Sequence, residues 1–513
     1  MRSQPGGHAH ANAQDRYNGN ANSDCNGNAM NVYPRRELFH KKPQTSIYRV
    51  FFLIAMILGG IWLISGWQKG GIEKPFTPTA TPTRSVDSYS LEGDTLFAAG
   101  KLDAAITAYR ESVRVDPSNA QVWAKLARIQ TYSSALKTTD PERLARLTDA
   151  LGSINEAVRL APDDSTVHAI RAFVLDWNAN ASLVCTPEEL AVAPTCDAVL
   201  DFLTEAEQEA FIALQLNNQN TLALAYFAEI LVDQQKWTQA EQYILQALER
   251  EDAAQLMDAH RVYAYVLESL GDYKQAIEEY DRALLITPNL TFLYLRAGAN
   301  YRRLAFGALN EDSAKPLYEK SLEYFQRAAQ INAQLEVFDP VPYLSIAKTY
   351  SQTGDYFAAA LNVQKALDFD PGNADTYGQL GIVFFKSRNY EGSIPALKCA
   401  IRGCTAEESC KARNGCDEGD PGTAITGLKL SPNTVVYYYT YGSVLAALSR
   451  PKDDKCGEAL LVFDEVQAAF PTDRDILGIV NEGRLVCQLV SSTPEAGATG
   501  LPVTPEATGT ATP

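Results

Sequence analysis

Histidine is scarce in this chain, which holds five among 513 residues. Three of them, His8, His10 and His40, lie in the first 47 residues, so only His168 and His260 belong to the body of the chain. Neither has a serine or cysteine partner that the sequence suggests. Each falls where a repeated helix usually carries a packing aromatic residue. We therefore expect both to be core residues, and we expect no nucleophilic catalysis based on histidine.

Other catalytic or metal-binding patterns are also missing. Ser134 and Lys137 have Ser-x-x-Lys spacing, as do Ser345 and Lys348, but this pair arises easily by chance and has no companion motif. The acidic run at 416–420 lacks the alternating oxygen ligands of a calcium loop. The sequence thus predicts a protein that is not an enzyme and that uses no cofactor or metal.

Basic residues are in deficit, with 45 Lys and Arg against 62 Asp and Glu and a net charge of −17. The first 49 residues hold more basic than acidic side chains, so the acidic charge lies in the rest of the chain. This balance argues against nucleic acid as the partner and against binding to an anionic membrane surface. The simplest interpretation is that acidic charge keeps an exposed body soluble.

One long run of the sequence has no charge at all. Val50–Trp67 is eighteen residues of apolar character, and as a helix it would be about 27 Å long, close to the hydrocarbon thickness of a bilayer. Five basic residues lie in the fifteen positions before it and two in the fifteen after it. The positive-inside rule then places the amino terminus in the cytoplasm and everything after Lys69 outside.

Two other interpretations of this run are less favoured. It is longer than a usual signal-peptide core, it begins fifty residues into the chain, and no clear small-x-small cleavage site follows it. It is also apolar on every face, unlike most buried core helices. We therefore predict an uncleaved signal anchor at residues 48–69, which makes this a single-pass protein of the plasma (cytoplasmic) membrane.

The segments beside the body have biased compositions. Residues 1–47 are rich in Asn, Gly, Ala and Gln, and they predict a disordered cytoplasmic tail. Residues 70–85 and 491–513 are rich in Thr and Pro. We expect the first of these to be an extended linker and the second a disordered tail. Both have the composition of stalks that are glycosylated in surface proteins.

The body, residues 86–490, repeats one pattern. In Met257–Asn289, small and apolar residues recur at spacings of three or four in two groups, which is the period of an amphipathic helix. Gly271 and Asp272 separate the groups and Pro288 closes the second one. The pattern consists of Tyr263, Ala264, Leu267, Ala276, Tyr280 and Ala283. This helix–turn–helix unit of about 34 residues resembles the tetratricopeptide repeat.

We count nine such units, followed by a helix that would cap the last apolar face. The fold class expected from this resemblance is all-α, a helical-hairpin repeat solenoid that forms a right-handed superhelix, plus one transmembrane helix. Four insertions interrupt the period, near 133–149, 178–202, 305–314 and 403–430. The first three fall between the two helices of a unit, and we expect them to form loops along one edge of the solenoid.

Cysteines cluster in or beside the insertions and the cap. Cys25 precedes the apolar run and the other eight follow it, as expected for disulfides in an oxidising compartment. A zinc site is the alternative, but paired ligands two to four residues apart are missing. Two pairs are predicted, and the three possible pairings of the remaining four cysteines stay open. The predicted pairs are Cys185–Cys196 and Cys456–Cys487, and the open set is Cys399, Cys404, Cys410 and Cys416.

The resemblance implies that the first helix of each unit lines a concave groove that contacts extended or helical peptides. Its groove positions here are mostly aromatic or basic, and fewer are acidic, which favours an extended partner that is acidic or carries carboxylates. Alternatively, several of these aromatics pack between units. The predicted partner-binding residues are Arg128, Phe173, Trp177, Arg261, Tyr265, Phe292, Arg302, Arg303, Lys348, Phe385 and Tyr439.

These features together predict a membrane-anchored, extracytoplasmic scaffold for protein–protein interaction that binds an extended peptide or protein in its groove. Two alternatives stay open. A receptor for a small molecule or glycan predicts one deep pocket, and an accessory subunit of an envelope enzyme or secretion assembly predicts stable co-purification with a larger complex. The partner, the pathway and the oligomeric state do not follow from the sequence.

Overall fold

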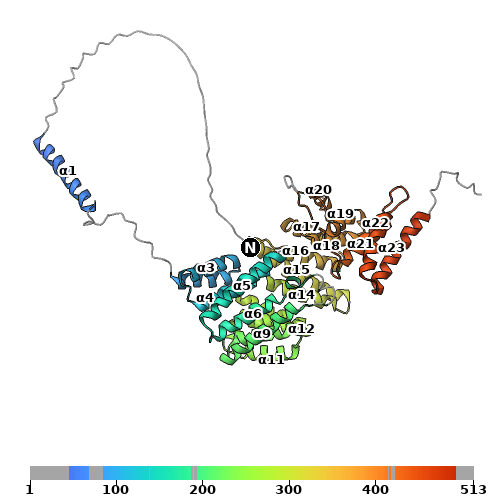
Figure 1. Ribbon diagram of the computed structural model, residues 1–513, viewed down its shortest axis with the longest axis horizontal. Coiled ribbons are helices and arrows are strands. Elements are labelled where there is room, and N and C mark those ends of the chain that lie inside the picture. Colours follow the sequence, from blue (N-terminus) through green and yellow to red (C-terminus); the bar gives the residue numbers. More distant parts are fainter. Residues whose placement is uncertain are drawn as a thin grey trace, which may run out of the picture. The chain divides into compact units, whose positions relative to one another are not determined.

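A computed structural model describes residues 46–68, 85–137, 139–186, 189, 193, 195–413, 415, 416 and 422–492. The chain divides into two compact bodies, Met1–Pro82 and Thr83–Pro513. Every regular element in the described ranges is helical, apart from the isolated bridges Cys404–Ile425 and Arg450–Asp453. The all-α class is therefore confirmed (Figure 1).

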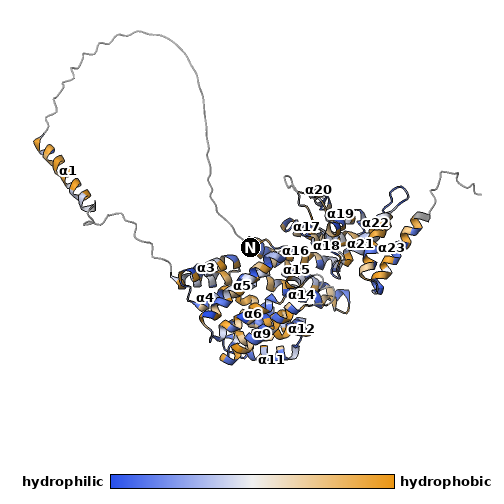
Figure 2. Cartoon of the chain, viewed as in Figure 1, coloured by the Kyte–Doolittle hydropathy of each residue, from blue (hydrophilic) through white to orange (hydrophobic). Residues whose placement is uncertain are grey.

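Helix α1, Ile47–Gln68, is the described part of the first body. It is apolar along nearly its whole length (Figure 2), and Ile47–Gly66 is long and apolar enough to cross a membrane. A signal sequence would pass the same test of length and composition. The predicted tail, linker and carboxy-terminal tail lie outside the described residues, apart from a few positions at their ends.

The second body, in its described residues, is a row of nine helical hairpins in which each hairpin packs against the next. The nine pairs, in order, are α2 (Val86–Ala98) with α3 (Leu102–Val115), α4 (Ala120–Ser134) with α5 (Asp140–Leu160), α6 (Ser165–Asn178) with α9 (Asp197–Leu216), α10 (Thr221–Asp233) with α11 (Trp237–Leu248), α12 (Met257–Leu270) with α13 (Tyr273–Ile286), α14 (Thr291–Phe306) with α15 (Glu311–Gln334), α16 (Val341–Thr353) with α17 (Tyr356–Phe369), α18 (Ala374–Lys386) with α19 (Tyr390–Arg402), and α21 (Val435–Leu448) with α22 (Cys456–Ala469). The short η1 (Ala253–Gln255) precedes α12. The last helix, α23 (Arg474–Ser492), packs on α21 and α22 as the predicted cap.

The turn inside the fifth hairpin follows from its residues. Gly271 ends α12 with φ +85°, a left-handed conformation that glycine adopts without a steric penalty. The side chain of Asp272 then caps α13 by accepting a hydrogen bond from the backbone N–H of Gln275. Gly354 and Asp355 repeat the same arrangement between α16 and α17. The break predicted at Gly271 and Asp272 is confirmed.

Small residues of first helices lie where a large side chain of the second helix crosses. A Cβ placed on Gly298 would come within 2.6 Å of the Phe325 ring, and one on Gly442 within 2.7 Å of the Phe463 ring. Both rings are fully buried. The glycines therefore set how closely the two helices of the sixth and ninth hairpins approach.

Two of the four insertions differ from the prediction. Most residues of the segment near 133–149 belong to α5, which begins at Asp140. The segment near 305–314 leaves only a short connection between the end of α14 at Phe306 and the start of α15 at Glu311. Helix α5 reaches 21 residues and α15 reaches 24. Both starts are capped, by Thr139 in α5 and by an Asn310–Ser313 capping box in α15, and caps of this kind extend a helix toward its amino end.

The other two insertions carry short helices of their own. The segment near 178–202 contains α7 (Ala181–Val184), and the one between the eighth and ninth hairpins contains α20 (Ala406–Ala412). Buried apolar side chains form one cluster that reaches from α3 to α14 and another that reaches from α16 to α23. We call helices α2–α13 the N-terminal half and helices α14–α23 the C-terminal half.

Candidate partner-binding face

First helices of successive hairpins lie side by side, and the side chains between them form the face that the repeat pattern assigns to partners. We call this face the inner face. In the N-terminal half it is occupied by the chain's own polar groups. Asp258 of α12 is fully buried and accepts hydrogen bonds from Arg128 Nε at 3.2 Å and from Tyr226 Oη at 2.6 Å. Tyr132 also donates to it.

A second ion pair lies beside the first. Arg261 donates from Nη1 to Glu229 Oε1 at 2.7 Å and from Nη2 to Oε2 at 2.5 Å, a two-pronged geometry that suits a guanidinium and a carboxylate. Arg261 is 6% exposed and Glu229 is 4% exposed. The Nε of Arg261 donates to Tyr132 at 3.1 Å, which joins the two pairs. We call this set the buried ion cluster: Arg128, Tyr132, Tyr226, Glu229, Asp258 and Arg261.

Aromatic rings fill the space around the cluster. Phe173 lies between Tyr132, at 5.0 Å between ring centroids, and Tyr226, at 4.5 Å. Phe292 stacks on Tyr132 at 5.5 Å. The Arg261 guanidinium lies 5.6 Å from the centre of the Phe173 ring, within the range of a cation–π contact. The rings therefore exclude water from the ion pairs.

Electrostatics inside the cluster are set by competition between burial and pairing. Burial alone would raise the pKa of Asp258, but the charges of Arg128 and Arg261 outweigh it and lower the pKa below its usual value. Burial opposes the charged form of Arg128 as well, yet Asp258 keeps the pKa of this guanidinium well above its ordinary value. The Arg128–Asp258 pair therefore stays charged at neutral pH.

The ends of the N-terminal half also meet. Asn289, in the turn before α14, donates from Nδ2 to the carbonyl of Ala99 at 3.3 Å. A Cβ on Gly100 would lie 2.4 Å from the Asn289 carbonyl oxygen, so the two turns are in direct contact. The first hairpin thus closes against the start of the sixth.

This packing corrects part of the predicted groove. Phe173 is fully buried, Arg261 is nearly so, and the Arg128 side chain is 19% exposed. Trp177 is half-buried and donates to Glu229 at 3.2 Å, and Phe292 is half-buried on Tyr132. The expectation that these positions are open fails because charged side chains of different first helices pair with each other. Arg128 and Asp258, for example, are 130 residues apart in the sequence. The sequence showed both signs of charge but not their pairing.

Tyr265 on α12 and Arg303 on α14 lie near the boundary between the two halves. The Tyr265 hydroxyl donates to Asp233 at 2.6 Å, and the Arg296 guanidinium lies 5.1 Å from its ring centre. Arg303 pairs with Glu268 and lies over the Tyr273 ring. Arg296 Nη2 pairs with the same carboxylate at 3.1 Å. Glu268 therefore pairs with both Arg296 and Arg303.

The C-terminal half differs at the adjoining position. Arg302 donates from Nη1 to the Ser345 carbonyl at 3.1 Å and to Thr349 Oγ1 at 3.4 Å, and its guanidinium lies 5.3 Å from the Phe325 ring centre. No carboxylate in the described residues pairs with it. Burial, Arg302 and Arg303 together lower the pKa of Lys348, which is exposed on α16. Arg302 and Lys348 therefore have no carboxylate partner in the described part of the chain, whereas Arg303 pairs with Glu268.

Two aromatic residues extend this part of the inner face. Phe385 of α18 is 36% exposed, and its ring centroid lies 5.7 Å from that of Tyr390. Tyr439 of α21 is half-buried, and burial raises the pKa of its hydroxyl. Among the predicted residues, the three exposed ones all lie in the C-terminal half, and the two buried ones lie in the N-terminal half. The exposed residues are Arg303, Lys348 and Phe385, the buried ones are Phe173 and Arg261, and the others are half-buried.

Comparison with known proteins now bears on this arrangement. A family model described as "TPR repeat" matches residues 93–137, and one described as "Tetratricopeptide repeat" matches residues 227–291. These matches fall on α2–α4 and on α10–α13, within the row of hairpins. The chain therefore contains tetratricopeptide repeats.

Several solved structures are similar to this tetratricopeptide-repeat array. A thermophilic TPR protein of Thermus thermophilus is 18% identical, with 42% of this chain and 98% of that one covered and a TM-score of 0.33. A Parabacteroides merdae tetratricopeptide repeat protein is 15% identical, with 58% and 98% covered and a TM-score of 0.32. The human IFIT1 dimer with PPP-AAAA is 14% identical, with 80% and 92% covered and a TM-score of 0.46. No curated protein sequence matches the chain.

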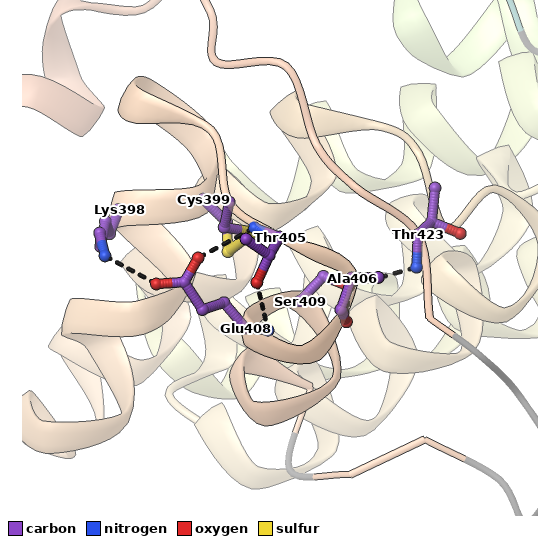
Figure 3. Close-up of a disulfide and its surroundings, with 8 residues drawn as sticks. Lys398, Cys399, Thr405, Ala406, Glu408, Ser409 and Thr423 are labelled. Carbon is purple, nitrogen blue, oxygen red and sulfur yellow. Dashed lines mark hydrogen bonds and ion pairs between the residues drawn. A yellow bond between two sulfur atoms is a disulfide. The ribbon is translucent and has the colours of Figure 1, made fainter.

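Disulfides tie the less regular parts of the tetratricopeptide array. Both predicted pairs are present, and the open set pairs by proximity in the sequence. Figure 3 shows Cys399 beside Thr405, whose side chain forms a capping box with Glu408 at the start of α20. Lys398 binds Glu408 at 2.9 Å. The four bonds are Cys185–Cys196, Cys399–Cys404, Cys410–Cys416 and Cys456–Cys487. Cys25 lies outside the described residues.

The two histidines of the array are buried, at 6% and 9% exposure, as expected of core residues. Each binds a glutamate of the second helix of its own hairpin, His168 with Glu209 at 2.6 Å and His260 with Glu279 at 2.7 Å. Among the described residues, no group of three His, Cys, Asp or Glu side chains is arranged to hold a metal ion. Sequence reasoning missed these pairs, although a glutamate three positions after the buried alanine of the second helix could have indicated them.

Proposed function

We propose that this chain is a membrane-anchored, extracytoplasmic scaffold without enzymatic activity, and that it binds an extended, acidic segment of a protein partner on the inner face of its C-terminal half. Tetratricopeptide repeats generally mediate protein–protein interaction, so the family supports the scaffold role. The filled inner face of the N-terminal half directs the proposal to helices α14, α16, α18 and α21.

The carrying observation is the unpaired state of Arg302. Its Nη1 is taken by Ser345 and Thr349, whereas no described group binds its Nε or Nη2. That free edge of a guanidinium matches both oxygens of a carboxylate. Lys348 adds an ammonium group nearby. Burial and the charge of Arg303 lower the pKa of Arg302, and burial and the charges of both arginines lower the pKa of Lys348. In a protein with a net charge of −17, such a patch favours an acidic ligand.

Membrane anchoring and location rest on separate observations. Helix α1 is apolar and uncharged within Val50–Gln68, and basic residues are more frequent before it than after it. Four disulfides after α1 fit an oxidising compartment. Protease added to intact cells should digest the array and leave α1 with its amino-terminal tail. An array that resists protease until the cells are lysed would place it inside.

The binding proposal is tested with the full chain in lipid nanodiscs at physiological salt. A labelled decapeptide of alternating Glu and Ser is titrated, with a Lys–Ser decapeptide of opposite charge as the comparison. We expect saturable binding of the acidic peptide alone. Arg302→Glu with Lys348→Glu should weaken it at least tenfold, about 1.4 kcal/mol, because two favourable charges become repulsive.

The matched control reverses two exposed lysines of second helices, Lys274→Glu on α13 and Lys315→Glu on α15. This control changes net charge by the same amount but leaves the inner face intact. If both double variants weaken binding equally, the peptide responds to overall charge and the proposed site is wrong. Unchanged binding by the Arg302 and Lys348 variant would also reject the site.

A further inference from the structure

The sequence contains two tripeptides of the form Asn-x-Ser or Asn-x-Thr in which x is not proline. One is Asn180-Ala181-Ser182 and the other is Asn289-Leu290-Thr291. Tripeptides of this form accept asparagine-linked sugars in chains that leave the cytoplasm. The surroundings of the two asparagines decide which of them a sugar transferase can reach in the folded array.

The first tripeptide lies on the surface, where α6 ends and the short α7 begins. Asn180 and Ser182 are both exposed, and Ala181 between them is half-buried. The tripeptide belongs to the insertion near 178–202, which the Cys185–Cys196 disulfide ties. It uses none of the residues assigned to the inner face.

The side chain of Asn180 has the conformation that sugar transfer needs. Its oxygen Oδ1 accepts hydrogen bonds from the Ser182 N–H at 3.0 Å and from the Ser182 hydroxyl at 2.8 Å. Two donors on this oxygen stabilise the negative charge that it gains when the amide nitrogen gives up a proton. The nitrogen Nδ2 donates to no group among the described residues. The amide nitrogen is therefore activated and accessible.

The second tripeptide has opposite surroundings. Asn289 is half-buried, and its Nδ2 donates to the Ala99 carbonyl at 3.3 Å. Leu290 is 1% exposed and Thr291 is 4% exposed. A sugar on Nδ2 would take the place of Ala99 and separate the first hairpin from the sixth. In the folded array Asn180 is accessible to a transferase, and Asn289 is not.

The compartment matters because sugar transfer of this kind takes place outside the cytoplasm, so the inference rests on the extracytoplasmic location proposed above. The Cys185–Cys196 disulfide lies in the same insertion as Asn180 and fits an oxidising compartment. Both modifications therefore require the same location of this segment.

We infer that Asn180 carries an asparagine-linked oligosaccharide. The donor is an oligosaccharide joined through pyrophosphate to a membrane lipid. Nδ2 forms a bond to the anomeric carbon of the first sugar, and the bond from that carbon to the pyrophosphate oxygen breaks with its electron pair on the oxygen. Nδ2 loses one proton to a base of the transferase, so the product is a neutral amide. The proposed membrane anchor keeps Asn180 near such a lipid donor.

The test uses the full chain purified from the membranes of the cells that naturally make it. Mass spectrometry of its peptides reports which asparagines carry a sugar. We expect a sugar on the peptide that contains Asn180 and none on the peptide that contains Asn289. An unmodified Asn180, or a modified Asn289, would overturn the inference.

Two substitutions of Ser182, made in the same cells, test recognition of the tripeptide. Ser182→Ala should lose the sugar, because it removes the hydroxyl that the tripeptide requires, and Ser182→Thr should keep it. A sugar that persists in Ser182→Ala would show that the tripeptide is not what the transferase recognises.

Ala181→Pro separates recognition from folding. Asn180 has an extended backbone and Ala181 is the first residue of α7, a position that proline suits, so the local fold should persist. Proline in the middle of the tripeptide prevents transfer, and the sugar should be lost. The matched control is Ala120→Pro, the same change after the capping Asn119 of α4, which should keep the sugar on Asn180. Loss in both variants, or in neither, would reject the inference.

Protease treatment of intact cells distinguishes this inference from the proposed location. An array that the protease reaches, with an unmodified Asn180, would overturn the sugar site alone. An array that lies inside the membrane would overturn both proposals.

Discussion

The inner faces of the two halves carry the same kinds of side chain, but these side chains interact differently in each half. In the N-terminal half, arginines and tyrosines of α4, α10 and α12 converge on Asp258 and Glu229, and their charges cancel inside the protein. In the C-terminal half, Arg302 and Lys348 stand without carboxylate partners among the described residues. A charged partner would have to displace an existing ion pair in the N-terminal half, whereas it could pair directly with Arg302 and Lys348 in the C-terminal half.

This difference concerns which contacts stabilise each half of the array. A solenoid is stabilised mainly by contacts between neighbouring hairpins. Here the N-terminal half adds contacts between distant helices, since Arg128 and Asp258 are 130 positions apart, and the turns at Gly100 and Asn289 touch. Such contacts join distant hairpins of the N-terminal half. The proposed partner site lies instead in the C-terminal half, where Arg302 and Lys348 have no carboxylate partner among the described residues.

The largest expected effect is in the N-terminal half. Asp258→Asn keeps the shape of the side chain but leaves Arg128 buried without its counter-ion. Breaking a buried ion pair in this way costs about 3–5 kcal/mol, and we expect that loss in the local stability of α4 and α12. Hydrogen exchange of these two helices measures it, because a long array does not unfold as one unit.

The matched control is Asp149→Asn, which removes the partner of Arg110. Both side chains of that pair are about half exposed, so the change should cost less than about 1 kcal/mol. If Asp258→Asn is as mild as the control, the cluster does not hold the half closed. The comparison between the halves would then lose its energetic basis.

The fold was predictable because its signal is local and repeated. Spacings of three and four in Met257–Asn289, with Gly271 and Asp272 between, define a hairpin without reference to any distant residue. The same reasoning failed at 133–149 and 305–314, where an excess of residues over the repeat length indicated loops. Caps at Thr139 and Asn310 instead start the helices early, and only the local cap chemistry distinguishes the two outcomes.

The candidate site was predictable only in part, because accessibility depends on distant contacts. The repeat register assigns Arg261 and Arg302 to the same kind of surface. It cannot show that Arg261 meets Glu229 and Tyr132 from other hairpins, while Arg302 meets a carbonyl and a hydroxyl. Pairing between helices more than thirty residues apart is a property of the superhelical path.

A smaller effect tests the same contrast with a second buried aspartate. Asp339, in the turn before α16, is 3% exposed, accepts from the Val341 N–H at 2.9 Å and from Asn332 at 3.1 Å, and has no cation beside it in the described part of the chain. Burial therefore raises its pKa to about 6, whereas the two arginines lower the pKa of Asp258. Between pH 4 and 6 the folded protein holds a proton on Asp339 that the unfolded chain has released. Stability from this group is thus lost as pH rises through that window.

Asp339→Asn removes this dependence because an amide does not ionise. We expect the variant to match the wild type near pH 4 and to exceed it at pH 7 by about 3 kcal/mol, the value of a shift of this size. Hydrogen exchange of α15 and α16, taken as the difference between the two proteins from pH 4 to 8, isolates Asp339 from all other carboxylates. Asp258→Asn should give a difference of opposite sign, a deficit that is largest at neutral pH and shrinks on acidification. If the stability differences of Asp339→Asn and Asp258→Asn had the same sign, pairing with arginine would not explain the contrast between the two halves.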